Sequence, residues 1–137
     1  MENEPLRIGR VTRATERTLG ISLTGSVMIY IENEMLDSLA EKHPDTYLTH
    51  IQEIGAILKN PDFVAFAPEE ERFIYARLYF KDGRFTMVYV TVKKTGRPSR
   101  WTYQGIASSP ATTVTRFEGM TFVRVQNKTV PSESSAA

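Results

Sequence analysis

The sequence predicts an α+β protein: two N-terminal helices packed on one face of a four- to five-stranded antiparallel sheet. After short strand-like segments, two segments with helical spacing of apolar residues precede several runs rich in aromatic and β-branched residues. Helices grouped ahead of strands are typical of this class, in which the helices cover one sheet face. We expect residues 1–26 to form an arm with a short strand, residues 27–126 a single α+β domain, and residues 127–137 a disordered tail.

The N-terminal segment is polar and carries arginines three or four residues apart, at Arg7, Arg10, Arg13 and Arg17. This spacing is compatible with an arginine-faced helix, although Gly and Thr residues disfavour one. A flexible basic arm or an added strand fits equally well. Alternating apolar residues then predict a short strand over residues 18–23, and a second strand is predicted over residues 27–31.

Two helices should follow, joined by a very short link. Asn33 is expected to cap a helix over residues 34–42, and Pro44 to end it at His43 because the residue before proline avoids the α conformation. Asp45 is expected to cap the second helix, which carries a broad apolar stripe and ends at residues 60–62. The short link predicts a tight helical corner.

The strongest strand signal is a hairpin over residues 72–94. Asp82-Gly83 separates two alternating runs, and this dipeptide favours the two-residue type I′ turn. A short strand over residues 63–66 precedes the hairpin. Residues 100–107 should pair as a third meander strand, and residues 121–125 as a late strand.

Alternation along the hairpin separates a core face from an open face. The predicted core face carries Ile74, Ala76, Leu78, Phe80, Val88, Val90 and Val92. The predicted open face, opposite the helices, carries Tyr75, Arg77, Tyr79, Met87, Tyr89 and Lys93. Tyrosines interleaved with cations are an unusual composition for a surface that only contacts water.

The net charge of +1 hides a strong asymmetry. Residues 32–71 hold ten acids against two bases, a balance of −8, whereas residues 72–100 hold eight bases against one acid, a balance of +7. Such segregation is expected of an anion-binding face. Mutual neutralisation across the surface is an equally good explanation.

Several classes of chemistry are disfavoured by the residue types. The chain has no cysteine and two histidines, His43 and His50, which Pro44 separates so that they do not share a helix face. We therefore expect no metal site, no disulfide and no cofactor. No apolar run is long enough to cross a membrane, so the sequence predicts a cytoplasmic protein without membrane contact.

Acid–base chemistry remains possible. His43, at a helix end, is the better candidate, although a capping role is the more common one for such a histidine. His50 is expected to be structural. Arg77 lies between Tyr75 and Tyr79, and this combination suits phosphate and base binding or, alternatively, ordinary cross-strand pairing. Candidate contacts to a phosphate backbone are Lys81, Arg84, Tyr89, Lys93, Arg97 and Arg100.

The segment over residues 29–64, followed by FIYARLYF, MVYVTV and RWTYQGIA, resembles phage-borne nucleases of the barnase–EndoU–colicin–RelE-like group. The shared features are a helix ending in Lys42-His43-Pro44, a second helix closed by Asn60-Pro61-Asp62, a basic hairpin and a threonine in the last strand. The resemblance covers roughly residues 27–107.

This resemblance implies metal-independent RNA cleavage, in which the 2′-hydroxyl attacks the adjacent phosphate on the sheet face away from the helices. It implies that His43 is the family's helix-terminal histidine, that Arg77 binds phosphate and that Thr102 is the polar residue of the last strand. For the proton transfers we hypothesise that His43 acts together with Tyr79 or Lys81. No glutamate or histidine stands on the predicted open face. The alternative is a non-catalytic phage protein that binds a host protein or nucleic acid through the same face.

Overall fold

The computed structural model describes residues 5–23, 27–95, 100–110, 116–117 and 120–125, and the predicted 127–137 tail lies outside this part. The described helices are α1 (Arg13–Leu19), α2 (Asn33–Lys42) and α3 (Tyr47–Lys59). The strands are β1 (Leu6–Arg10), β2 (Met28–Ile31), β3 (Phe63–Ala67), β4 (Arg72–Lys81), β5 (Arg84–Thr95), β6 (Arg100–Pro110), β7 (Arg116–Phe117), β8 (Met120–Thr121) and β9 (Val123–Arg124).

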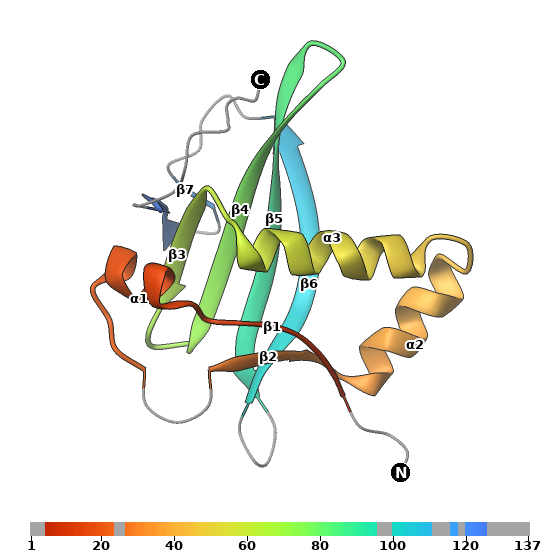
Figure 1. The fold of residues 1–137 in the computed structure, drawn as a ribbon, viewed down its shortest axis with the longest axis horizontal. Helices are drawn as coiled ribbons and strands as arrows, with labels where there is room; N and C mark the ends of the chain where they lie inside the picture. Colours follow the sequence, from red (N-terminus) through yellow and green to blue (C-terminus); the bar gives the residue numbers. More distant parts are fainter. Residues whose placement is uncertain (1–4, 24–26, 96–99, 111–115, 118–119, 126–137) are drawn as a thin grey trace.

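The α+β class is confirmed, but the sheet is larger than predicted. Seven strands form one open sheet in the order β1-β2-β6-β5-β4-β3-β9, while β7 and β8 pair separately (Figure 1). The pairing is antiparallel except between β2 and β6, which run parallel. The antiparallel meander of β3, β4, β5 and β6 agrees with the sequence-based expectation.

The N-terminal segment belongs to this sheet. β1 pairs with β2, and Val11 just after it is fully buried in the main core. Thr12 caps α1 by accepting a hydrogen bond from the Thr15 amide at 3.1 Å, and Gly20 ends the helix with φ of 69°. The strand predicted over residues 18–23 is therefore wrong, because its first residues complete a helix that has good caps at both ends.

Helix α2 ends where proline predicts. His43 is its C-cap, and α3 begins four residues later. The two helices do not pack equally on the sheet: α2 has no buried residue, and only Met35 and Leu36 of this helix contact the main core. The prediction that both helices cover one sheet face therefore holds for α3 alone.

The β4–β5 hairpin has the predicted turn. Asp82 has φ of 55° and Gly83 has φ of 74°, as a type I′ turn requires at both positions. With two residues in the turn, Lys81 pairs with Arg84, Arg77 with Val88 and so on along both strands. Paired residues point to the same side of a sheet, so odd-numbered residues of β4 share a face with even-numbered residues of β5.

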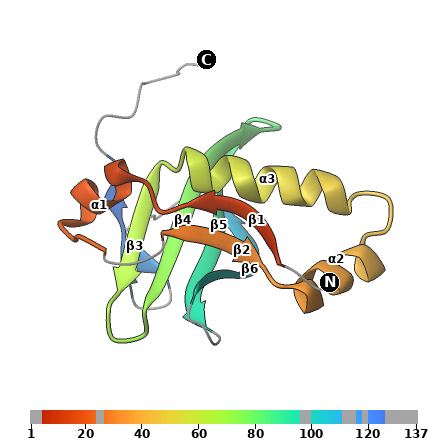
Figure 2. The ribbon, with the colours of Figure 1, turned by 60° about the horizontal axis from the view of Figure 1, so that its bottom comes forward.

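Helix α3 crosses the odd-numbered face of β4 and covers it (Figure 1). Ile54, Ile57 and Leu58 of α3 are fully buried there, with Tyr75 and Val90 of the hairpin beneath them. The same helix also contacts β1 at the far end of the sheet (Figure 2). The sheet therefore curves around α3, which lies between its first strand and its central strands.

A smaller core occupies the opposite face of the sheet. Its buried members are Ala65, Ile74, Ala76, Met87, Tyr89 and Phe122. Phe122, which lies between β8 and β9, packs its ring 5.7 Å from that of Tyr89. The centre of the sheet is thus buried on both sides.

The predicted open face therefore does not exist as one surface. Tyr75 is 0% exposed and lies under α3, and Tyr89 is 3% exposed on the other face. The prediction erred in the register: a two-residue turn places Tyr75 beside Val90, whereas Tyr89 faces the opposite side with Ala76. Trp101 and Tyr103 of β6 point into the main core.

Replacing Tyr75 with phenylalanine should stabilise the fold. The Tyr75 hydroxyl is buried and has no hydrogen-bond partner among the described residues, and burial of an unpaired hydroxyl costs roughly 1–3 kcal/mol. We expect Tyr75→Phe to raise the free energy of unfolding by about 1 kcal/mol in urea titrations followed by circular dichroism.

Tyr89→Phe is the matched control. The Tyr89 hydroxyl accepts a hydrogen bond from Ser109 at 3.2 Å, so its removal should lower the free energy of unfolding by about 1 kcal/mol or leave it unchanged. Equal destabilisation by both substitutions would contradict the assignment of Tyr75 to an unpaired, buried position.

Candidate functional site

The structure divides the predicted site residues between two regions. Arg77 and Tyr79 point to the face that α3 covers, in the same rows as Val88 and Thr86. Lys93 and Thr102, which pair with each other, belong to the other side of β5. A single site that includes all predicted residues is therefore excluded by the register.

The first region is a cleft of about 220 Å³ between α3 and the strands β5 and β6. His50 and Glu53 from α3 form one wall, and Val88 with residues 106–108 forms the other. His50 and Glu53 lie three residues apart on the helix, which places them next to each other on its surface. The cleft thus brings an imidazole and a carboxylate against the edge strand of the meander.

Arg77 lies beside this cleft. It pairs with Val88, and Val88 pairs with Ser108, so the three form one row across the sheet on the side of α3. Its guanidinium carbon lies 5.5 Å from the centroid of the Tyr79 ring, a cation–π contact. Tyr79 lies two residues further along β4 and is partly buried.

Electrostatic effects support this grouping. Burial raises the pKa of Tyr79, and the negative charges of Glu53 and Asp62 raise it further, against the opposing effect of Arg77. Burial and the charge of Glu53 also raise the pKa of Tyr103 to about 12. The Glu53 carboxylate is therefore close enough to act on both tyrosines.

His43 contacts His50, a residue of the cleft wall. Its ring centroid is 4.5 Å from that of His50, with the planes tilted by 44°. The two histidines come from different helices, as the sequence indicates, but the tight corner at Pro44 brings their rings into contact. The structure thus places His50, which was expected to be structural, in the cleft wall, with His43 exposed beside it.

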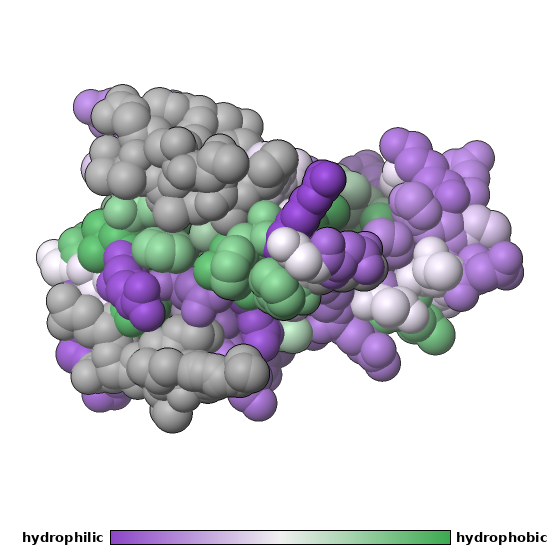
Figure 3. Space-filling model, turned by 90° about the horizontal axis from the view of Figure 1, so that it is seen from above, coloured by the Kyte–Doolittle hydropathy of each residue, from purple (hydrophilic) through white to green (hydrophobic). Residues whose placement is uncertain are grey.

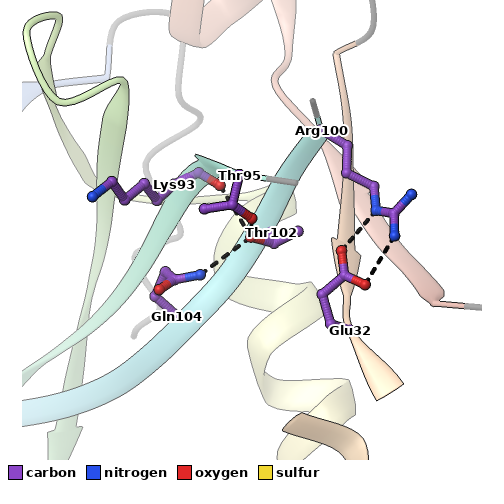
Figure 4. A network of polar contacts seen from close by, with 6 residues as sticks. All are labelled: Glu32, Lys93, Thr95, Arg100, Thr102 and Gln104. Atoms are coloured by element: carbon purple, nitrogen blue, oxygen red, sulfur yellow. Dashed lines mark hydrogen bonds and ion pairs between the residues drawn. The ribbon is translucent and has the colours of Figure 1, made fainter. Parts of the chain in front are cut away.

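The second region is a polar network around Thr102 (Figure 4). The Thr102 hydroxyl is fully buried. It donates to the Lys93 carbonyl at 3.1 Å, lies 2.8 Å from the Thr95 hydroxyl, and accepts from the Gln104 amide at 3.1 Å. One hydroxyl hydrogen and two lone pairs are all satisfied by these contacts, so Thr102 is held in place as a structural residue.

Glu32 and Arg100 form an ion pair in the same region (Figure 4). The Arg100 guanidinium donates two hydrogen bonds to the Glu32 carboxylate, at 2.6 and 2.9 Å, and lies 5.9 Å from the Tyr30 ring centroid. A pocket of about 340 Å³ lies between this network and the first turns of α2. Arg100 is thus engaged by a carboxylate, which argues against its predicted role in phosphate binding.

The remaining predicted cations lie at the margins. Arg84, at the hairpin tip, and Lys93 are both exposed. Lys81 ends β4, but its side chain lies outside the described part of the structure, as does the whole of Arg97. Within the described residues, no group of three or more His, Asp or Glu side chains could hold a metal ion.

In the same part of the chain, no helix is both long and apolar enough to cross a membrane. Comparisons with known protein families, with curated proteins and with solved structures found no match. The resemblance to the barnase–EndoU–colicin–RelE-like group stays a prediction.

The Glu32–Arg100 pair should make stability depend on pH. Hydrogen bonding to Arg100 holds the pKa of Glu32 below its usual value of 4.5, with charge attraction adding to this and burial opposing it. A carboxyl with a lowered pKa stabilises the folded state above its ordinary pKa and loses this effect as the pH falls. Because each side chain remains 31% exposed, the effect should be about 1 kcal/mol or less.

Glu32→Gln should accordingly lower the free energy of unfolding at about pH 7 and have little effect at about pH 3. Urea titrations at several pH values measure this difference. Glu34→Gln, an exposed neighbour in the same pocket wall, serves as the control and should show no such trend. A difference that stays constant between the two pH values would refute the role of the ion pair.

Proposed function

We propose that the protein is a metal-independent endoribonuclease that acts at the cleft between α3 and the β5–β6 strands. The observation that carries this proposal is the convergence of His50 and Glu53 on one cleft, beside Arg77 on the same sheet face. Transfer of a phosphodiester to a neighbouring hydroxyl needs a base, an acid and a cation. These three residues supply one of each.

The proposed reaction begins with Glu53, which accepts the proton of the 2′-hydroxyl as that oxygen bonds to phosphorus. Arg77 donates hydrogen bonds to the phosphate oxygens on which negative charge increases, because guanidinium matches phosphate geometry. The bond from phosphorus to the 5′ oxygen then breaks, and protonated His50 gives its proton to that oxygen. The products are a 2′,3′-cyclic phosphate and a free 5′-hydroxyl.

Tyr79 has a supporting role in this proposal. Its raised pKa makes the phenol a weaker proton donor at neutral pH, which disfavours the expectation that it exchanges protons. The cation–π contact with Arg77 instead limits where the guanidinium can lie. In the same way, His43 contacts His50 and, in this proposal, orients the His50 imidazole.

The proposal predicts that purified protein cleaves single-stranded RNA in the presence of EDTA. Because general acid–base catalysis typically contributes about 10²- to 10⁴-fold, His50→Ala and Glu53→Gln should each lower the rate by roughly that factor. His43→Ala should have a smaller effect. End-labelled RNA resolved on gels gives the rates, and the cyclic phosphate and the 5′-hydroxyl identify the chemistry.

Glu69→Gln is the matched control for Glu53→Gln, because Glu69 is an exposed acid in the β3–β4 connection. A substrate with a single 2′-deoxynucleotide should resist cleavage at that position. Intact RNA at high protein concentration would contradict catalysis and favour the alternative function, binding of a host protein or nucleic acid without cleavage. Full activity in His50→Ala would contradict the assigned site.

A further inference from the structure

The tip of the β4–β5 hairpin carries large apolar side chains that no other part of the described structure covers. Phe80 is 64% exposed, Phe85 53% and Leu78 36%. Phe80 and Phe85 pair across the strands, and their ring centroids lie 4.8 Å apart. The hairpin projects beyond the crossing of α3 (Figure 1), and the view onto this end shows apolar side chains next to a polar turn (Figure 3).

The charges around these rings are mainly positive. Arg84 follows the turn and is exposed. By the register, Arg84 and Arg77 both lie on the side of the ribbon opposite to Phe80 and Phe85 and flank the rings from there. Among the described residues, no ion pair is found for either arginine. Asp82, at the turn itself, is the acid of the hairpin. Exposed rings flanked by unpaired guanidinium groups are complementary to a polyanion with planar apolar groups.

We propose that Leu78, Phe80 and Phe85 form a stacking surface for the unpaired bases of single-stranded RNA, with Arg84 at its margin. This inference rests on the proposed function, because it names the class of RNA that would reach the cleft. The rings stack on base faces, while the Arg84 guanidinium binds a phosphate where the strand passes the margin of this surface.

Phenylalanine side chains select for unpaired bases on simple chemical grounds. A phenyl ring has no hydrogen-bond donor or acceptor, so it binds the face of a base and reads no edge. In a duplex the base faces are covered by their neighbours, and the major groove of A-form RNA is too narrow for side chains to read. Single strands leave the faces accessible and are bound with little dependence on sequence.

The rings and the cleft lie on opposite sides of the β4–β5 ribbon, because Phe80 pairs with Phe85 whereas Arg77 pairs with Val88. Phe85 precedes Val88, a cleft wall residue, by three positions on β5, which corresponds to about 10 Å along a strand. A short oligonucleotide that binds at both places therefore has to pass around the edge of the ribbon. Bases stacked at the tip would hold one end of such a strand while its other end reaches the side of Arg77.

A lipid surface fits these observations less well than RNA. Asp82 stands at the apex of the hairpin, ahead of both phenylalanines. Insertion of this tip into a membrane would bring the carboxylate first against headgroups that are commonly anionic. Binding of RNA along the side of the ribbon leaves Asp82 in water.

The test measures binding separately from cleavage. A 12-nucleotide RNA with 2′-O-methyl groups cannot be cleaved by 2′-hydroxyl attack, and a 2-aminopurine base within it reports stacking through fluorescence quenching. We expect the double variant Phe80→Ala/Phe85→Ala to bind this strand about ten- to a hundredfold more weakly, and to lose the quenching. A duplex of the same sequence should bind weakly to both proteins.

Leu6→Ala is the matched control, because Leu6 is 42% exposed on the edge strand β1 and should leave RNA binding unchanged. Wild-type affinity in the double variant, absence of RNA binding by the wild-type protein, or equal affinity for duplex would each overturn the inference. Anionic vesicles that bind the wild-type protein more tightly than RNA does would overturn it in favour of a membrane.

The two proposals can fail independently. Cleavage with unchanged affinity in the double variant supports the endoribonuclease function and rejects the stacking surface. If the double variant loses affinity and the wild-type protein does not cleave RNA, the stacking surface is supported and the endoribonuclease function is rejected.

Discussion

The two-residue turn at Asp82-Gly83 determines which side chains of β4 and β5 lie on each face of the sheet. Because side chains alternate with a period of two, a shift of one residue in register would exchange the two faces completely. The positive φ angles at both turn positions hold the pairing of Arg77 with Val88 and of Tyr75 with Val90. The position of Arg77 beside the α3 cleft therefore depends on this turn, because the turn sets the register that pairs Arg77 with Val88.

The curvature of the sheet around α3 restricts where a ligand can bind. Tyr75 and Val90 are buried under the helix, and Tyr89 is buried in the smaller core on the other face. The middle of the sheet is thus closed on both sides. Exposed positions remain at the edge of β6, where α3 leaves the sheet, and on the hairpin beyond the helix. The candidate cleft and the aromatic tip occupy these two places.

Local patterns predicted most elements but could not predict which faces come together. Proline after His43 and Asp-Gly at residues 82–83 act within a few residues, so the helix end and the turn were predictable. The cleft depends on contacts between distant segments: His50 meets Ser108 only after α3 has packed across the meander. One signal was available in the sequence, because a two-residue turn by itself implies that Tyr75 and Tyr89 face opposite sides.

Mutual neutralisation, one of the two explanations of the charge segregation, applies to part of the basic segment. Glu32 with Arg100, Glu70 with Arg72 and Glu71 with Lys94 are ion pairs that join the acidic and basic segments. Neutralisation therefore accounts for Arg72, Lys94 and Arg100, which lie at the strand ends opposite to the hairpin turn. Arg77 and Arg84 have no such pair among the described residues, and both lie on the hairpin. Since unpaired cations attract anions most strongly, Arg77 beside the α3 cleft and Arg84 at the hairpin tip are the positions on which the proposed binding of RNA depends.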